Sequence, residues 1–207
     1  MNAPARTRTI APAWPLYLAA FAIAAVVAGA VGEAFSGGSL AELGIPDPGA
    51  ATTVGLPALR GVAWLLMALA TGSFLLSAFL IAPKQTQEDL NGARLTVDGH
   101  LASRTGAHAS AGIALIGLVM IPLVLSDVSG QPLNTVLFEA AAWSQALDQV
   151  ADARVWLIVA AFAVVVAAFG YAATSWWSQV WLFLGAIVVV MPCLLYTSLS
   201  GLARQTD

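Results

Sequence analysis

The sequence predicts an all-α, polytopic membrane helix bundle with five transmembrane helices and a cytoplasmic N-terminus. Of its 207 residues 59% are hydrophobic and only 9% are charged, whereas soluble domains carry about 25% charged residues. The 8 basic and 11 acidic residues are spaced so that long stretches between them carry no charge. A helix of about 20 apolar residues crosses the core of a bilayer, and these stretches are long enough to supply such helices.

The spans are placed between the charged residues in chain order. One uncharged stretch, between Arg154 and Arg204, is too long for a single helix. Hydroxyls, an amide and two indoles between Thr174 and Gln179 suit the headgroup region, so this segment predicts a turn that divides the stretch in two. The predicted parts are a cytoplasmic tail at 1–13, a membrane region at 14–192, and within it spans at about 14–31, 61–83, 110–125, 155–173 and 180–192.

The orientation follows from the basic residues, because short cytoplasmic loops carry the excess of Lys and Arg. With the N-terminus inside, the outer side holds only Arg60 and Arg154. The inner side holds Arg6, Arg8, Lys84, Arg94 and Arg104.

The first span has an alternative interpretation as a secretory signal peptide, since Arg6 and Arg8 precede an apolar run that contains Ala28-Gly29-Ala30. Small residues favour a retained helix, because a face without bulky side chains lets another helix approach closely. In the first span this face comprises Ala20, Ala24, Ala28 and Gly32, and a second such face comprises Ala68 and Gly72, with Ser73 and Ser77 beside them.

Two long outer loops differ in their predicted structure. The loop from Ser36 to Leu59 contains Pro46-Asp47-Pro48-Gly49, which predicts a turn with positive φ at the glycine and not a helix. Asp47 could pair with Arg60 at the membrane surface. The segment from Asn134 to Asp152 has helical apolar spacing, which predicts a helix either on the outer membrane surface or packed on the bundle.

No catalytic, cofactor-binding or metal-binding residue is predicted. The five spans contain no Asp, Glu, Lys, Arg or His, which argues against a proton relay or a pair of intramembrane haem ligands. His100 and His108 fall in the predicted inner loop from Lys84 to Ala109, with Asp98 nearby, and are expected to be solvated. Met67, Met120 and Met191 lie on three different spans and are expected to pack, and Pro122 is expected to bend the third span. We therefore expect neither an enzyme nor a nucleic-acid-binding protein.

The first outer loop, Gly44-Ile45-Pro46-Asp47-Pro48-Gly49-Ala50-Ala51-Thr52-Thr53-Val54-Gly55-Leu56-Pro57-Ala58-Leu59-Arg60, runs directly into a span. It resembles the corresponding loop of actinobacterial membrane proteins that fuse a copper-resistance CopD-type region to a CtaG-like cytochrome c oxidase assembly region. Later segments of the chain resemble the same proteins in the same order. These are Ala82-Pro83 at the end of the second span, Ser126 to Leu133 at the end of the third, and Ala153-Arg154 at the start of the fourth. The resemblance covers about residues 14–192.

The resemblance implies a multi-pass plasma-membrane protein that moves copper or supplies it to cytochrome c oxidase. The implied partners are the lipid bilayer, cytochrome c oxidase or copper chaperones, and the C-terminal membrane region of the same protein. In that family a Thr-Gly-His motif follows the fifth span, and histidines of later helices are the copper ligands. No position of this chain matches them, so copper is expected for the parent protein and no cofactor for this part of it.

The tail at 193–207 resembles the translated end of a sequencing-library adaptor, and it contains the single cysteine, Cys193. We therefore expect it to be non-native and expect the chain to be an N-terminal fragment. Two alternatives remain: a small membrane scaffold or partner-binding subunit without transport activity, and, less favoured, a membrane enzyme or haem protein.

Overall fold

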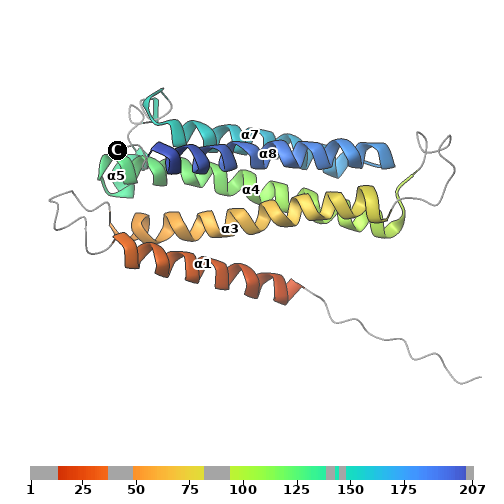
Figure 1. The fold of residues 1–207 in the computed structure, drawn as a ribbon, viewed down its shortest axis with the longest axis horizontal. Coiled ribbons are helices and arrows are strands. Elements are labelled where there is room, and N and C mark those ends of the chain that lie inside the picture. Colours follow the sequence, from red (N-terminus) through yellow and green to blue (C-terminus); the bar gives the residue numbers. More distant parts are fainter. Residues whose placement is uncertain (1–13, 37–48, 82–93, 139–142, 145–147, 204–207) are drawn as a thin grey trace, which may run out of the picture.

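A computed structural model describes residues 14–36, 49–81, 94–138, 143–144 and 148–203, and in this part of the chain every regular element is helical (Figure 1). The helices run side by side, as predicted for an all-α bundle. Their bounds are α1 Trp14–Ser36, α3 Ala50–Leu75, the π-helical segment η1 Leu76–Leu80, α4 Val97–Ser129, α5 Leu133–Phe138, α7 Ala151–Ala172 and α8 Trp176–Ala203.

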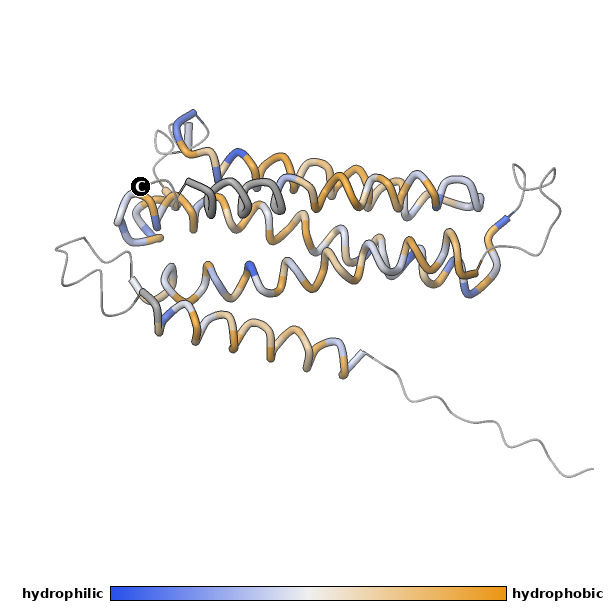
Figure 2. The backbone as a smooth tube through the Cα atoms, in the orientation of Figure 1, coloured by the Kyte–Doolittle hydropathy of each residue, from blue (hydrophilic) through white to orange (hydrophobic). Residues whose placement is uncertain are grey.

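Four helices of the described chain are long and apolar enough to cross a membrane, namely Trp14–Ala34, Ala50–Leu80, Val97–Ser129 and Ala151–Ala172. The fifth predicted span corresponds to α8, whose described apolar stretch Trp176–Pro192 is shorter. Apolar residues recur along all five long helices (Figure 2). The protein is therefore a multi-pass helical membrane protein whose surroundings are a lipid bilayer.

The bundle is built around α4, which packs against α3 on one side and α7 on the other. The helix α8 packs against both α7 and α3, whereas α1 contacts α3 and lies at the edge of the bundle (Figure 1). Small residues allow these close contacts: a Cβ at Gly117 would lie 3.0 Å from the Ala160 Cβ of α7. We call the two ends of the bundle the Arg60 end and the Arg94 end. The Arg94 end, with the turn between α7 and α8, is the predicted cytoplasmic one.

The small-residue face of α1 contacts α3, as predicted. A Cβ at Gly32 would lie 2.4 Å from the Pro57 Cγ, and a Cβ at Gly61 would lie 3.0 Å from the Ala28 Cβ. The second predicted face was wrong for Ala68 and Gly72, because a Cβ at Gly72 would meet open space and Ala68 is exposed, whereas Ser73 and Ser77 beside them are buried.

The prediction that Ser36 to Leu59 forms a non-helical loop was wrong for its second part. Gly49 has the expected positive φ, 91°, and its carbonyl oxygen accepts hydrogen bonds from the Thr52 and Thr53 amides. Helix α3 begins at the next residue, Ala50, and continues through Pro57. The positive φ thus sets the start of a helix, and Pro57 lies two turns inside it, where Gly32 of α1 leaves room for its ring.

The predicted inner loop up to Ala109 is also shorter than expected. Helix α4 begins at Val97, where the Thr96 hydroxyl caps it by accepting a hydrogen bond from the Gly99 amide at 3.1 Å. The helix ends at Gly130, whose φ is 64°. Pro122 is buried inside it. With 33 residues, α4 is about 50 Å long, so it extends well beyond a bilayer core about 30 Å thick.

The helix predicted from Asn134 to Asp152 is interrupted at Val150. The described residues 134–138, 143–144 and 148–149 are helical, so the error is confined to the C-terminal end, where Val150 is non-helical and α7 begins at Ala151. Val136 of α5 is buried against Leu125, which agrees with the packed alternative and not with a helix lying on the lipid surface. Residues 139–142 and 145–147 of this prediction lie outside the described residues, as does the tail at 1–13.

The predicted break between the last two spans was confirmed. Helix α7 ends at Ala172 and α8 begins at Trp176. Within the predicted turn, however, Gln179 is helical and fully buried. The Trp176 indole Nε1 donates a hydrogen bond to the Ala78 carbonyl oxygen at 2.7 Å, and Ala78 belongs to the π-helical segment η1. This hydrogen bond holds the start of α8 against the end of the second span.

Candidate functional site

One ion pair joins two helices at the Arg60 end. The Arg60 Nη2 donates to the Asp152 Oδ2 at 2.5 Å. The predicted partner of Arg60, Asp47, lies outside the described residues. Nearby in the same half of the bundle, the Thr52 and Ser126 hydroxyls are buried and 2.8 Å apart. These contacts connect α3 to α7 and to α4, and they serve packing more directly than chemistry.

The two histidines are helical and lie near the Arg94 end. The His108 Nδ1 is 2.6 Å from the Arg104 carbonyl oxygen, and its ring meets the Tyr171 ring edge to face at 5.2 Å. The Arg104 guanidinium lies over the same tyrosine ring, 5.5 Å from its centre. Among the described residues, no group of three His, Cys, Asp or Glu side chains is arranged to hold a metal ion. The expectation that these histidines lie in a loop was wrong, since both belong to α4.

Of the three methionines on predicted spans, two line one hollow between α3 and α8. This hollow, called the methionine hollow below, has a volume of about 390 Å³. It is lined by Trp64, Met67, Ala68, Thr71, Ile187, Val190 and Met191. Met67 is buried, whereas Met191 is half exposed. Met120 is fully buried in α4 and does not line this hollow. Sequence spacing could not reveal this pair, because Met67 and Met191 are 124 residues apart and line one hollow only because α3 packs against α8.

Gln179 is a polar side chain inside an apolar contact. It is fully buried, and neither its Nε2 nor its Oε1 has a hydrogen-bond partner within the described part of the chain. Its spacing from Leu182, Ala186 and Val189 places it on the buried face of α8. That spacing was visible in the sequence, but the neighbouring indoles and hydroxyls made a turn the more obvious interpretation.

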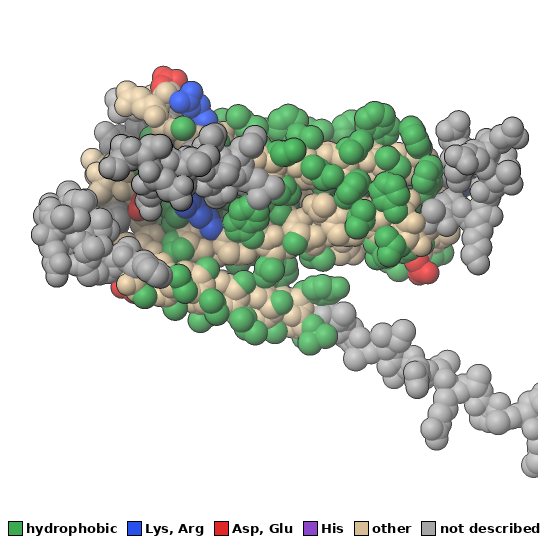
Figure 3. Space-filling view, in the orientation of Figure 1, with side chains coloured by type: hydrophobic (Ala, Val, Ile, Leu, Met, Phe, Trp, Pro, Cys, Tyr) green, Lys and Arg blue, Asp and Glu red, His purple; other side chains and the backbone are tan. Residues whose placement is uncertain are grey.

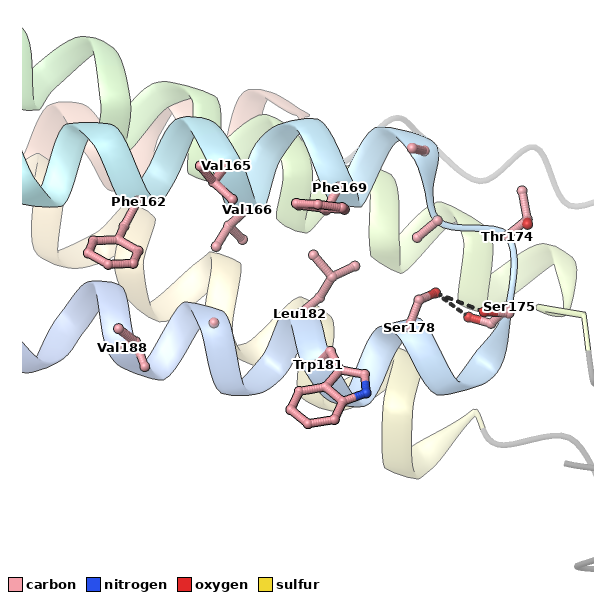
Figure 4. Close-up of a pocket in the computed structure, with 13 residues that line it drawn as sticks. Phe162, Val165, Val166, Phe169, Thr174, Ser175, Ser178, Trp181, Leu182 and Val188 are labelled. Carbon is pink, nitrogen blue, oxygen red and sulfur yellow. Dashed lines mark hydrogen bonds between the residues drawn. The ribbon is translucent and has the colours of Figure 1, made fainter. Parts of the chain in front are cut away.

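A groove of about 650 Å³, larger than the hollow between α3 and α8, lies between α7 and α8 (Figure 4). Val166 and Leu182 form its buried floor, and Phe162, Phe169 and Trp181 stand at its exposed edges. Towards the Arg94 end, the groove closes with the polar residues Thr174, Ser175 and Ser178. The Ser178 hydroxyl donates to the Ser175 carbonyl oxygen at 2.6 Å.

The charged side chains visible on one face of the molecule lie towards the two ends, and hydrophobic side chains cover the length between them (Figure 3). Such a surface suits contact with lipid along the middle of the bundle. No protein-family model, curated protein or solved structure matches this chain.

Proposed function

We propose that this helix bundle is the N-terminal part of a multi-pass plasma-membrane protein that handles copper, either by transporting it or by supplying it to cytochrome c oxidase. Two things support the proposal. The first is the resemblance of the loop from Gly44 to Arg60 to CopD/CtaG-type fusion proteins. The second is structural: Met67 of α3 and Met191 of α8 line one hollow.

The methionine hollow carries the proposal because thioether sulfur is a soft ligand that selects Cu(I) over harder metal ions. Two thioethers do not complete a copper site on their own. In the proposed protein they contact copper as a transported substrate, and the remaining ligands come from the histidines that the resemblance assigns to later helices. Met191 is half exposed at the open side of the hollow, where such a helix would approach.

A Cu(I) titration of the detergent-purified chain against a chromogenic chelator tests the proposal. All variants carry Cys193→Ser, because a cysteine thiolate binds Cu(I) by itself. We expect weak Cu(I) binding that is lost when Met67 and Met191 are both changed to Leu. Met120→Leu is the matched control, since Met120 lies away from the hollow. The pair His100→Ala and His108→Ala is a second control and leaves binding unchanged.

Binding that survives in the Met67 and Met191 double variant, or that disappears with the two histidines, contradicts this assignment. Absence of any Cu(I) binding by the Cys193→Ser chain also contradicts a role for the methionine hollow.

A second candidate function is a membrane scaffold that binds a partner helix. The observation in its favour is the open small-residue face at Ala68 and Gly72, beside the methionine hollow. Changing both residues to Leu would then leave the melting temperature of the isolated chain unchanged while reducing the size of the complex that it forms in native membranes. An unchanged complex would argue against this candidate.

A further inference from the structure

We infer that the groove between α7 and α8 is a binding site for an anionic phospholipid, with one acyl chain in the groove and the phosphate beside Arg94. The inference rests on the geometry of the groove and on the charge at its end. It does not depend on the proposed role in copper handling.

The groove has the length of one leaflet. Between Phe162 and Ala172 it follows ten residues of α7, which correspond to about 15 Å of helix. This is half of a bilayer core about 30 Å thick. A transmembrane helix would need a surface along the whole bundle, whereas the acyl chain of a single lipid needs one only from the interface to the midplane. The extent of the groove therefore favours a lipid over another helix.

The polarity of the groove also matches a lipid. Its deep part is lined by aromatic and aliphatic side chains, and Trp181 stands at its edge (Figure 4). The hydroxyl groups of Thr174, Ser175 and Ser178 occur only at the Arg94 end, where α7 ends and the turn begins. The Ser178 hydroxyl donates to the Ser175 carbonyl oxygen and the Ser175 hydroxyl donates to the Ser178 hydroxyl, so the exposed Thr174 hydroxyl is the one that can donate to an ester or phosphate oxygen.

A basic residue is fixed at the polar end of the groove. The main chain of Arg94 forms an antiparallel bridge with Ser175, and the Leu95 amide donates to the Thr174 carbonyl oxygen at 3.2 Å. These main-chain contacts hold the Cα atom of Arg94 beside the hydroxyl-bearing residues Thr174 and Ser175. Arg94 is exposed and belongs to no salt bridge between described residues; the acid nearest to it in the described sequence, Asp98, is also exposed. Basic residues between helices at the cytoplasmic side bind anionic headgroups.

Native mass spectrometry of the chain in micelles that contain equal phosphatidylglycerol and phosphatidylcholine tests the site. We expect the wild type to retain phosphatidylglycerol preferentially and Arg94→Gln to lower this preference about fivefold. Arg154→Gln is the charge-matched control, because Arg154 is exposed at the opposite end of the same bundle, and it leaves the preference unchanged.

A second pair of variants tests the acyl-chain groove. Val165 and Val164 are neighbours on α7 and about equally exposed, 48% and 54%, but only Val165 lines the groove. Val165→Trp should reduce retention of both lipids, and Val164→Trp should not. The inference fails if Arg94→Gln and Arg154→Gln change the preference for phosphatidylglycerol equally. It also fails if Val165→Trp and Val164→Trp change lipid retention equally. It also fails if the wild type is a dimer that Val165→Trp converts to a monomer, since the groove would then hold a second copy of the chain.

Discussion

The Arg60 guanidinium of α3 and the Asp152 carboxylate of α7 form a salt bridge between residues 92 positions apart in the sequence. The two partners differ in exposure: the arginine side chain is 41% exposed and the aspartate side chain only 13%. The carboxylate therefore depends on the pair more than the guanidinium does. Loss of the arginine would leave a mostly buried negative charge without its partner, which is costly in a membrane protein.

Arg60→Gln should destabilise the bundle more than Asp152→Asn does. We expect a loss of about 1 to 2 kcal/mol for Arg60→Gln, reduced from the cost of a fully buried pair because the arginine is partly exposed, and a smaller loss for Asp152→Asn. Unfolding in mixed detergent micelles measures the difference. Arg154→Gln is the control, and an effect of Arg60→Gln no larger than that of the control would show that the pair contributes little.

Gly32→Leu should separate α1 from α3. Even a Cβ at this position would meet the Pro57 ring, so a larger side chain forces the helices apart and costs about 1 to 3 kcal/mol. Gly72→Leu, in open space on the same pair of neighbouring spans, should be nearly neutral. Melting temperatures of the two variants, followed by circular dichroism, compare them directly. Equal melting temperatures would contradict the close helix contact.

Trp176→Phe should loosen the junction between α8 and η1. The substitution removes one hydrogen bond, from the indole to the Ala78 carbonyl oxygen, and should cost about 1 kcal/mol. Hydrogen exchange of the amides at 76–81 should increase in this variant. Trp177→Phe is the matched control, because Trp177 is about half exposed, and faster exchange in both variants would argue against a specific role for the Trp176 indole.

Gln179→Met should stabilise the protein or leave it unchanged. The glutamine amide is buried without a hydrogen-bond partner in the described chain, and burial of such a group is unfavourable. Methionine has a similar length and no amide to desolvate. Thermal unfolding in detergent measures the change. A clear loss of stability would mean that the amide has a partner, such as a buried water molecule.

The fold class could be predicted because the bilayer constrains composition strongly. Charged residues bracket the spans, and the polar segment after Ala173 divides the last two helices as expected. The helix ends were harder to place, because the prediction took charged and turn-forming residues as the limits of helices. In the structure, α3 extends ten residues before Arg60, and α4 extends past Arg104 and His108 to its cap at Thr96. Charges mark the limits of the membrane, whereas caps mark the limits of helices.

The hollows beside α8 could not be predicted from sequence spacing. The methionine hollow requires the register of α3 against α8, and the position of Arg94 at the end of the α7–α8 groove requires the main-chain bridge from Arg94 to Ser175. Such long-range placements depend on packing between helices and not on periodicity within one helix. The start of α4 has a local signal that the prediction did not use, namely the capping residue Thr96 followed by the acidic Asp98 in the first turn.

The Trp176 hydrogen bond to Ala78 and the bridge from Ser175 to Arg94 have a consequence for biogenesis. Both join the turn between α7 and α8 to segments that are synthesised much earlier. During translation these segments enter the membrane before their partners exist, so their carbonyl and amide groups lack these partners until the α7–α8 hairpin is made. The Arg94 end of the bundle is thus completed last.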